Sequence, residues 1–123
     1  MSPRRIGVEY IPVCAVDDLV PGRGTCALVN GAQVAIFRLP QGSVYAIGNL
    51  DPFSGANVLS RGIVGDLKGE LVVASPIYKQ HFSLVSGRCQ EKSDVRVPVY
   101  PVRTLRGRIE VGSEPIADGK RVA

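Results

Sequence analysis

An Asn-Gly pair between two apolar runs is the feature that most constrains how this chain folds. Asn30-Gly31 separates residues 25–29 from residues 32–37, and both flanking runs are mostly apolar. A two-residue hairpin turn of type I′ needs positive φ at both central residues, which asparagine followed by glycine tolerates well. The pair therefore predicts a β-hairpin across residues 25–37.

Short apolar runs separated by turn residues recur along the rest of the chain, which predicts an all-β fold. Single strands are expected at residues 10–15, 44–47 and 80–84, and hairpins across residues 63–74 and 99–111. No stretch has the length and the 3.6-residue apolar period of a helix. Repeated short strands of this kind favour a small β sandwich or barrel.

The length of 123 residues is that of one domain. We expect an N-terminal arm at residues 1–9, a β domain at residues 10–112 and a flexible C-terminal tail at residues 113–123. No apolar stretch is long enough for a secretory signal or a membrane span, so a cytoplasmic protein that does not interact with membranes is expected.

The cysteines and the charges narrow the functional classes further. Three cysteines without a C-x-x-C pair indicate free thiols, and Cys14 and Cys26 are expected to be buried among apolar neighbours. The net charge of +4 comes from residues 79–123, which carry nine basic and five acidic side chains. Such a bias can steer an acidic partner. A nucleic-acid-binding barrel is disfavoured, because no strand interleaves basic and aromatic residues.

The order of the elements resembles that of Rieske-type ferredoxin domains. In that family two loops project from one end of the β structure and hold a [2Fe–2S] cluster, through Cys-x-His in the first loop and Cys-x-x-His in the second. Residues 49–51 fall on the first motif and residues 75–82 on the second, where Pro76 and Phe82 match the family pattern. The resemblance implies a Rieske-type β sandwich or barrel with two projecting loops.

All four cluster-ligand positions of that family are changed in this chain. The residues at these positions are Asn49, Asp51, Ser75 and Tyr78. They cannot supply the thiolates and imidazoles that such a cluster requires. The chain has one histidine and three cysteines, so neither a site with two histidines nor one with four cysteines can be built from it alone.

Cluster-free members of this fold occur among the small subunits of NAD(P)H-dependent nitrite reductase, and two segments look like theirs. Residues 45–63 contain Asn-x-Asp-Pro-Phe-Ser, and residues 70–84 contain Ala-Ser-Pro-x-Tyr-Lys-Gln. The resemblance implies an accessory subunit with no cofactor of its own. Its partner, the nitrite reductase large subunit, would carry FAD, a [4Fe–4S] cluster and siroheme, and would pass electrons from NAD(P)H to nitrite, giving ammonium.

The first loop offers candidate docking residues, each with a structural alternative. Phe53 is either an aromatic anchor for the partner or a cap on the local core. Asp51 is a local turn-former or a docking residue. Arg61 can pair with Asp51, with a partner carboxylate or with an anion, or remain solvated.

The second loop contributes Tyr78, Lys79, Gln80 and His81 to the same candidate surface. The Tyr78 hydroxyl is expected to fill the vacated cluster space by hydrogen bonding to Asp51 or Asn49. Lys79 and His81 are expected surface contacts, and a lone histidine is no metal motif. No catalytic triad and no phosphate-binding glycine loop is present.

Two functional hypotheses therefore remain from the sequence. The first is the accessory subunit of nitrite reductase, which makes the chain part of an oxidoreductase without being catalytic itself. The second is a cluster-free, Rieske-like binding module that regulates another oxidoreductase through the same loops.

Overall fold

Antiparallel strands are the main regular elements of the computed structural model, which describes residues 9–116. Two single-turn 3-10 helices, η1 (Val16–Asp18) and η2 (Leu59–Arg61), interrupt them. The strands are β1 (Tyr10–Ala15), β2 (Gly24–Val29), β3 (Ala32–Arg38), β4 (Val44–Gly48), β5 (Ile63–Leu67), β6 (Glu70–Ala74), β7 (His81–Ser83), β8 (Val99–Tyr100), β9 (Val102–Leu105) and β10 (Arg108–Gly112).

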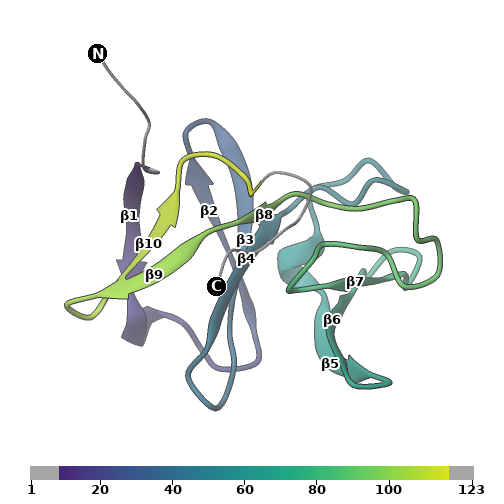
Figure 1. Ribbon diagram of the computed structural model, residues 1–123, viewed down its shortest axis with the longest axis horizontal. Helices are drawn as coiled ribbons and strands as arrows, with labels where there is room; N and C mark the ends of the chain where they lie inside the picture. Colours follow the sequence, from purple (N-terminus) through teal and green to yellow (C-terminus); the bar gives the residue numbers. More distant parts are fainter. Residues whose placement is uncertain (1–8, 117–123) are drawn as a thin grey trace.

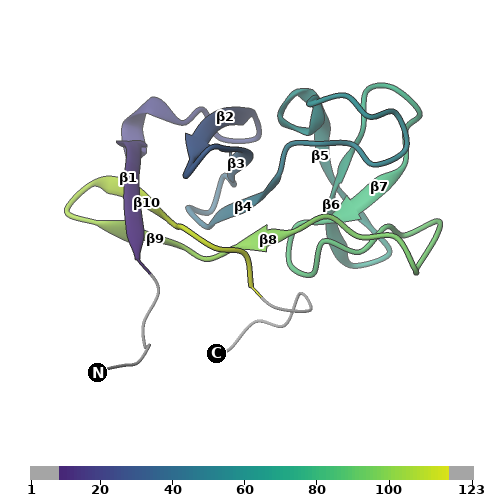
Figure 2. The ribbon, with the colours of Figure 1, turned by 90° about the horizontal axis from the view of Figure 1, so that it is seen from above.

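The strands form three open sheets, so the expected all-β fold is confirmed, and none of the sheets closes into a barrel. The sheet orders are β1-β10-β9, β2-β3-β4-β8 and β5-β6-β7. In Figures 1 and 2 the β1-β10-β9 sheet lies at one end of the molecule and the β5-β6-β7 sheet at the other. Within the described residues no helix has the length and apolar character needed to cross a bilayer.

The Asn-Gly hairpin is confirmed. Asn30 and Gly31 have φ of 51° and 85°, and Val29 pairs with Ala32 across the turn. The hairpin expected across residues 63–74 is also present. Its strands pair as far as Leu67 and Glu70, so Lys68-Gly69 alone turns the chain, with φ of 54° and 86°.

Strand β3 lies between two hydrophobic cores because its side chains alternate between faces. Ala35 and Phe37 enter the core shared with the β5-β6-β7 sheet, whereas Val34 and Ile36 enter the core shared with the β1-β10-β9 sheet. The other fully buried members of the first core include Ile47, Leu59, Val73, Phe82 and Leu84. The position of the loops that follow β4 and β6 depends on this first core.

The ends of the described chain lie side by side. Tyr10 pairs with Gly112, and the Ser113 N–H donates to the Glu9 carbonyl over 2.8 Å. Ile116 also donates its N–H to Val99. The remainder of the expected arm and tail, residues 1–8 and 117–123, lies outside the described residues.

The expected burial of both N-terminal cysteines is wrong for Cys26. The thiol of Cys26 is exposed, Cys14 is half-buried, and Cys89 is the buried one. Strand alternation explains the result, because Cys26 shares the outer face of β2 with the exposed Leu28, whereas Val29 points inward. All three cysteines are free thiols.

Gly24 is required where β2 meets η2. A Cβ at Gly24 would lie 2.2 Å from the Ser60 carbonyl oxygen and 2.7 Å from a ring carbon of Phe37. Gly24→Ala is therefore expected to lower the free energy of unfolding by about 1–3 kcal/mol, measured by urea denaturation. Gly65→Ala is the matched control, since a Cβ there meets open space. Equal stabilities of the two variants would contradict this packing.

Candidate functional site

Two loops at the end of the molecule that carries the β5-β6-β7 sheet form the candidate site. The first loop, residues 49–58, runs from β4 to η2, and the second, residues 75–80, joins β6 to β7. Both lie at the end opposite the β1-β10-β9 sheet (Figures 1 and 2). The site is described below from its buried polar residues outward.

Asn49 is buried and links the start of the first loop to its end by hydrogen bonds. Its side-chain Nδ2 donates to the Asn57 carbonyl and to Gln33 Oε1, both over 3.1 Å, and contacts the Cys26 sulfur at 3.5 Å. Its Oδ1 accepts from the Ser60 N–H over 2.7 Å. Buried amides need such partners to offset the loss of water, so Asn49 is a structural residue of the loop.

A hydrogen bond between two buried side chains joins the loops. The Ser75 hydroxyl donates to Asp51 Oδ2 over 2.6 Å, and both side chains are 0% exposed. The second carboxylate oxygen, Oδ1, accepts from the Phe53 N–H over 2.8 Å, which confirms Asp51 as a turn-former. Asp51 and Ser75, 24 residues apart in the chain, are therefore hydrogen-bonded directly to each other.

These hydrogen bonds keep the Asp51 carboxylate charged. Burial alone raises its pKa, but the Ser75 hydroxyl and the N–H groups of Phe53 and Ser54 stabilise the anion and hold the pKa below its ordinary value. A charged acceptor makes the bond from Ser75 stronger than one between neutral groups. The link between the loops is therefore charge-assisted at neutral pH.

The second loop is a tight turn built around Ser75. The Ser75 N–H donates to the Gln80 carbonyl over 2.9 Å, and its carbonyl accepts from the Lys79 N–H over 3.1 Å. Lys79 closes the turn with φ of 69°. The turn presents residues 77–79 outward, and all three are exposed.

The expectation that Tyr78 plugs the vacated space is wrong. Its side chain is 61% exposed and makes no hydrogen bond with Asp51 or Asn49. The reason is that the Ser75 hydroxyl already donates to the Asp51 carboxylate, while the Asn49 side chain is hydrogen-bonded to the backbone of Asn57 and Ser60. Small polar side chains fill the interior and Tyr78 points to solvent.

The donor set does not fit an iron–sulfur cluster. Of the four ligand positions, Asn49, Asp51 and Ser75 are buried and hydrogen-bonded, and none of the four carries a thiol or imidazole. Across residues 9–116, no group of three or more histidine, cysteine, aspartate and glutamate side chains is placed to hold a metal ion.

Phe53 packs against the local core, whereas the possible pair between Asp51 and Arg61 is not formed. Phe53 is half-buried against the first core, with its ring centroid 6.1 Å from that of Phe82. Arg61 is exposed and does not pair with Asp51, whose carboxylate has other partners. Arg61 therefore remains available for a group outside this chain.

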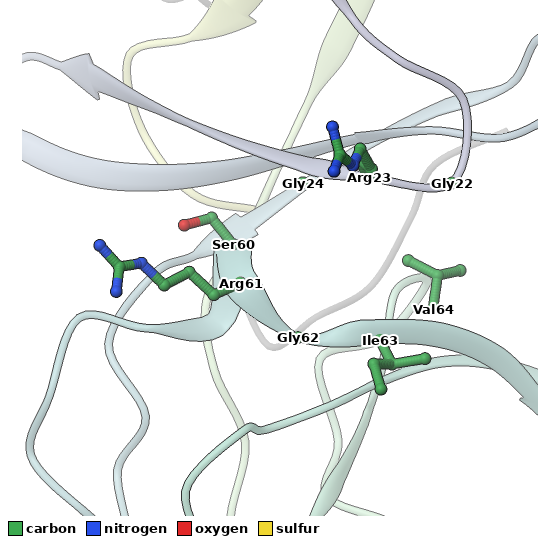
Figure 3. Close-up of a pocket in the computed structure, with 8 residues that line it drawn as sticks. All are labelled: Gly22, Arg23, Gly24, Ser60, Arg61, Gly62, Ile63 and Val64. Carbon is green, nitrogen blue, oxygen red and sulfur yellow. The ribbon is translucent and has the colours of Figure 1, made fainter.

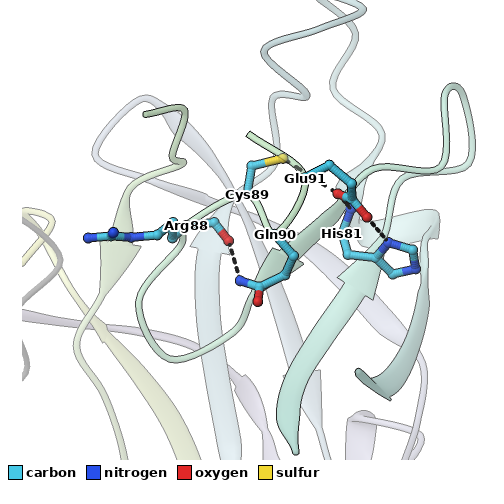
Figure 4. Close-up of polar contacts among 5 residues, drawn as sticks. All are labelled: His81, Arg88, Cys89, Gln90 and Glu91. Atoms are coloured by element: carbon cyan, nitrogen blue, oxygen red, sulfur yellow. Dashed lines mark hydrogen bonds and ion pairs between the residues drawn. The ribbon is translucent and has the colours of Figure 1, made fainter. Parts of the chain in front are cut away.

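His81 is engaged within the domain, as Figure 4 shows. The ring atom Nδ1 lies 2.6 Å from Glu91 Oε2, and the backbone N–H of His81 donates to Glu91 Oε1 over 2.8 Å. Burial raises the pKa of Glu91, but the contacts from His81 outweigh it and leave that pKa below its ordinary value. Burial raises the pKa of the neighbouring Cys89 thiol.

Sequence reasoning missed Glu91, Gln33 and Ser60 as partners of the site residues. Glu91 lies ten residues from His81 in a polar, irregular segment, and Gln33 lies 16 residues from Asn49. No local spacing marks either contact. The pairing of β3 with β4 places Gln33 beside Asn49, and the bridge between Phe82 and Cys89 places Glu91 near His81.

Comparison with known proteins decides the family. The model of the Rieske-like [2Fe-2S] domain matches residues 9–112. The nitrite reductase (NADH) small subunit of Salmonella typhimurium is 47% identical over 104 residues, which cover 84% of this chain and 96% of that protein. The chain belongs to the nitrite reductase small-subunit family. The resemblance seen in the sequence is thereby confirmed, and proteins of this family are subunits of an NAD(P)H-dependent oxidoreductase.

A solved structure of the small-subunit family agrees with the fold. The crystal structure of the Mycobacterium tuberculosis protein assigned as an NADH-dependent nitrite reductase small subunit has a TM-score of 0.85 and 51% identity. The match covers 90% of this chain and 100% of that one. The similarity also extends to the nitrite reductase [NAD(P)H] large subunit of Klebsiella oxytoca, which is 39% identical over 104 residues. These cover 85% of this chain but 11% of that protein.

Removing the bond between the loops should destabilise the domain. Ser75→Ala leaves Asp51 Oδ2 buried without its donor, so the free energy of unfolding at neutral pH is expected to fall by about 1–3 kcal/mol, measured by urea denaturation.

The contribution of Asp51 should depend on pH in a defined direction. Its folded pKa lies below the ordinary value of 3.8, so its stabilisation is complete well above that value and is lost as the pH falls through the folded pKa. The difference in unfolding free energy between wild type and Asp51→Asn is therefore expected to shrink as the pH is lowered below 3.8. Asp17→Asn, an exposed control, should show little difference at either pH. A pH-independent Asp51→Asn effect would contradict this account.

Proposed function

We propose that this chain is the non-catalytic accessory subunit of a cytoplasmic NAD(P)H-dependent nitrite reductase, and that it docks on the large subunit through its two-loop end. The observation that carries the docking surface is the Asp51–Ser75 hydrogen bond, which closes the two-loop end internally. With their polar residues paired inside, the loops present a protein-binding surface instead of a metal site.

Both loops of this end carry exposed large apolar side chains. Leu50, Ile77 and Tyr78 are 48%, 45% and 61% exposed, and each lies within three residues of Asp51 or Ser75. Large apolar side chains that gather on a surface indicate an interaction site. Tyrosine is also among the residues that dominate the binding energy of interfaces.

The remaining candidate residues have supporting or peripheral roles in this proposal. Lys79 is exposed, and its ammonium donates to the Pro76 carbonyl over 3.3 Å, which leaves it able to meet an acidic group at the rim. Gln80 has a buried Oε1 without a hydrogen-bond partner. Phe53 contacts Phe82 and His81 contacts Glu91, so these two residues stabilise the loops inside the domain.

The Klebsiella oxytoca relative supports the choice of partner. That protein, a nitrite reductase large subunit, contains a segment similar to this chain. Joining two modules in one polypeptide raises their effective concentration and favours pairs that work side by side. In this chain Tyr10 and Gly112 pair on the sheet remote from the loops, so a linker attached there leaves the two-loop end free to bind.

The redox groups are placed on the partner in this proposal. Siroheme, a [4Fe–4S] cluster, FAD and the NAD(P)H site would belong to the large subunit, because a [4Fe–4S] cluster needs four thiolates and this chain has three cysteines. The free thiols of Cys14, Cys26 and Cys89 are typical of a reducing compartment such as the cytoplasm.

Reconstitution tests the function directly. The cognate large subunit is assayed for NAD(P)H-dependent nitrite reduction with and without this chain, after co-purification from a mixture of the two. We expect co-elution and an activity that rises with this chain up to a saturating ratio. If the large subunit is fully active alone and does not bind this chain, the accessory-subunit function fails. The chain would then be a Rieske-like binding module of another oxidoreductase.

Variants of the loop tip test the docking surface. Tyr78→Ser and Lys79→Glu are each expected to weaken binding to the large subunit by about tenfold or more, measured by biolayer interferometry, with an unchanged melting temperature. Leu105→Ser is the control for Tyr78→Ser, because Leu105 is an exposed apolar residue on the remote β9. Normal binding by both loop variants would exclude the loop tip as the interface.

A further inference from the structure

A groove of about 430 Å³ runs between the start of β2 and the start of β5, next to the end of the first loop. In Figure 3 Arg23 extends upward from the chain just before β2, at the upper edge of the groove, and Arg61 extends sideways from η2 at its lower edge. Ile63 and Val64 line the same lower side. None of the residues that line the groove is acidic.

Backbone contacts build the walls of this groove. Gly24 lies so close to η2 that a Cβ would approach the Ser60 carbonyl oxygen to 2.2 Å. At the other side, a Cβ on Gly62 would lie 2.3 Å from the Ala74 carbonyl oxygen. The two arginines are therefore carried by closely packed backbone, and their Cα positions are held by the fold.

Both guanidinium groups lack a partner within the described part of the chain. No ion pair or hydrogen bond between residues 9 and 116 involves the side chain of Arg23 or Arg61. Other arginines are engaged, since Arg103 pairs with Glu110 at 2.8 Å. Two unpaired guanidinium groups beside one groove favour an anionic ligand, because each can bind a carboxylate through two parallel hydrogen bonds.

An exposed apolar side chain adjoins these charges. Ile63 is 75% exposed, directly after the turn that carries Arg61. A small inorganic anion gains nothing from contact with an apolar side chain, whereas a peptide that combines acidic and apolar side chains matches both features. The groove is also continuous with the two-loop end, because η2 terminates the first loop.

We propose that this groove binds an acidic segment of the nitrite reductase large subunit, with carboxylates on Arg23 and Arg61 and an apolar side chain on Ile63. The proposal rests on the function proposed above and extends the interface from the loop tip around the first loop to β2. Charged contacts at the edge of an interface mainly accelerate association and make it dependent on salt.

Charge reversal tests the groove. Binding of the purified large subunit to wild type, to the double variant Arg23→Glu/Arg61→Glu and to the control Arg108→Glu is measured at low and high salt. Arg108 is an exposed arginine on the remote β10. At low salt the double variant is expected to bind about thirtyfold or more weaker, mostly through slower association, and the control within about twofold of wild type. Wild-type affinity should fall with salt more steeply than that of the double variant.

The outcomes separate this proposal from the proposed function. If wild type does not bind the large subunit, both fail. If wild type binds and Tyr78→Ser weakens it while the folded double variant binds normally, the accessory-subunit function stands and the groove proposal is overturned. Binding of inorganic phosphate is measured for the same proteins. If the double variant still binds the large subunit but no longer binds phosphate, the groove binds a small anion, and the proposal is overturned.

Ile63→Ser provides a second measurement that leaves the arginines intact. Because Ile63 is exposed, the variant is expected to fold with an unchanged melting temperature. It should weaken binding about threefold to tenfold at both salt concentrations, through faster dissociation. Unchanged affinity would show that no apolar side chain of the large subunit binds at Ile63.

Discussion

The hydrogen bond from Ser75 to the Asp51 carboxylate is the interaction on which the functional end of this protein depends. It joins two loops from different sheets, at positions that the sequence resemblance matches to iron ligands of Rieske-type ferredoxins. A bond to a charged acceptor contributes about 1.5–3 kcal/mol, and a buried carboxylate left without a donor costs a comparable amount. Because Ser75 and Phe53 satisfy both oxygens of Asp51, the loops keep a definite shape without a metal.

The surroundings of this bond determine what remains for a partner. Asn49 and Phe53 point inward, to Ser60 and Phe82 respectively, so the loop interior is occupied. The side chains left outside include the apolar Ile77 and Tyr78 beside the basic Lys79 on the second loop, with Arg61 at the end of the first. Apolar side chains with charged neighbours are the usual anatomy of a protein interface, and the chain belongs to a family of small subunits of a larger enzyme.

Part of the site was predictable from composition and local pattern, and part was not. The count of one histidine and three cysteines excludes the two common ligand sets in any fold. The role of Asp51 as a turn-former also followed from its own neighbours, since the bonded N–H lies two residues away. The orientation of Tyr78 was predicted wrongly, because it depends on Ser75 having already satisfied a carboxylate 24 residues earlier in the chain.

The sequence by itself determined the geometry of the first hairpin and the iron–sulfur ligand sets that this chain cannot supply alone. Asn30-Gly31 specified a hairpin because few residue pairs accept two successive positive φ angles. The tertiary structure alone decided which polar residues meet, such as His81 with Glu91, and which arginines remain without a partner. These outcomes depend on how separate strands pack around the two sides of β3, and contacts between distant residues leave no spacing in the sequence from which to infer them.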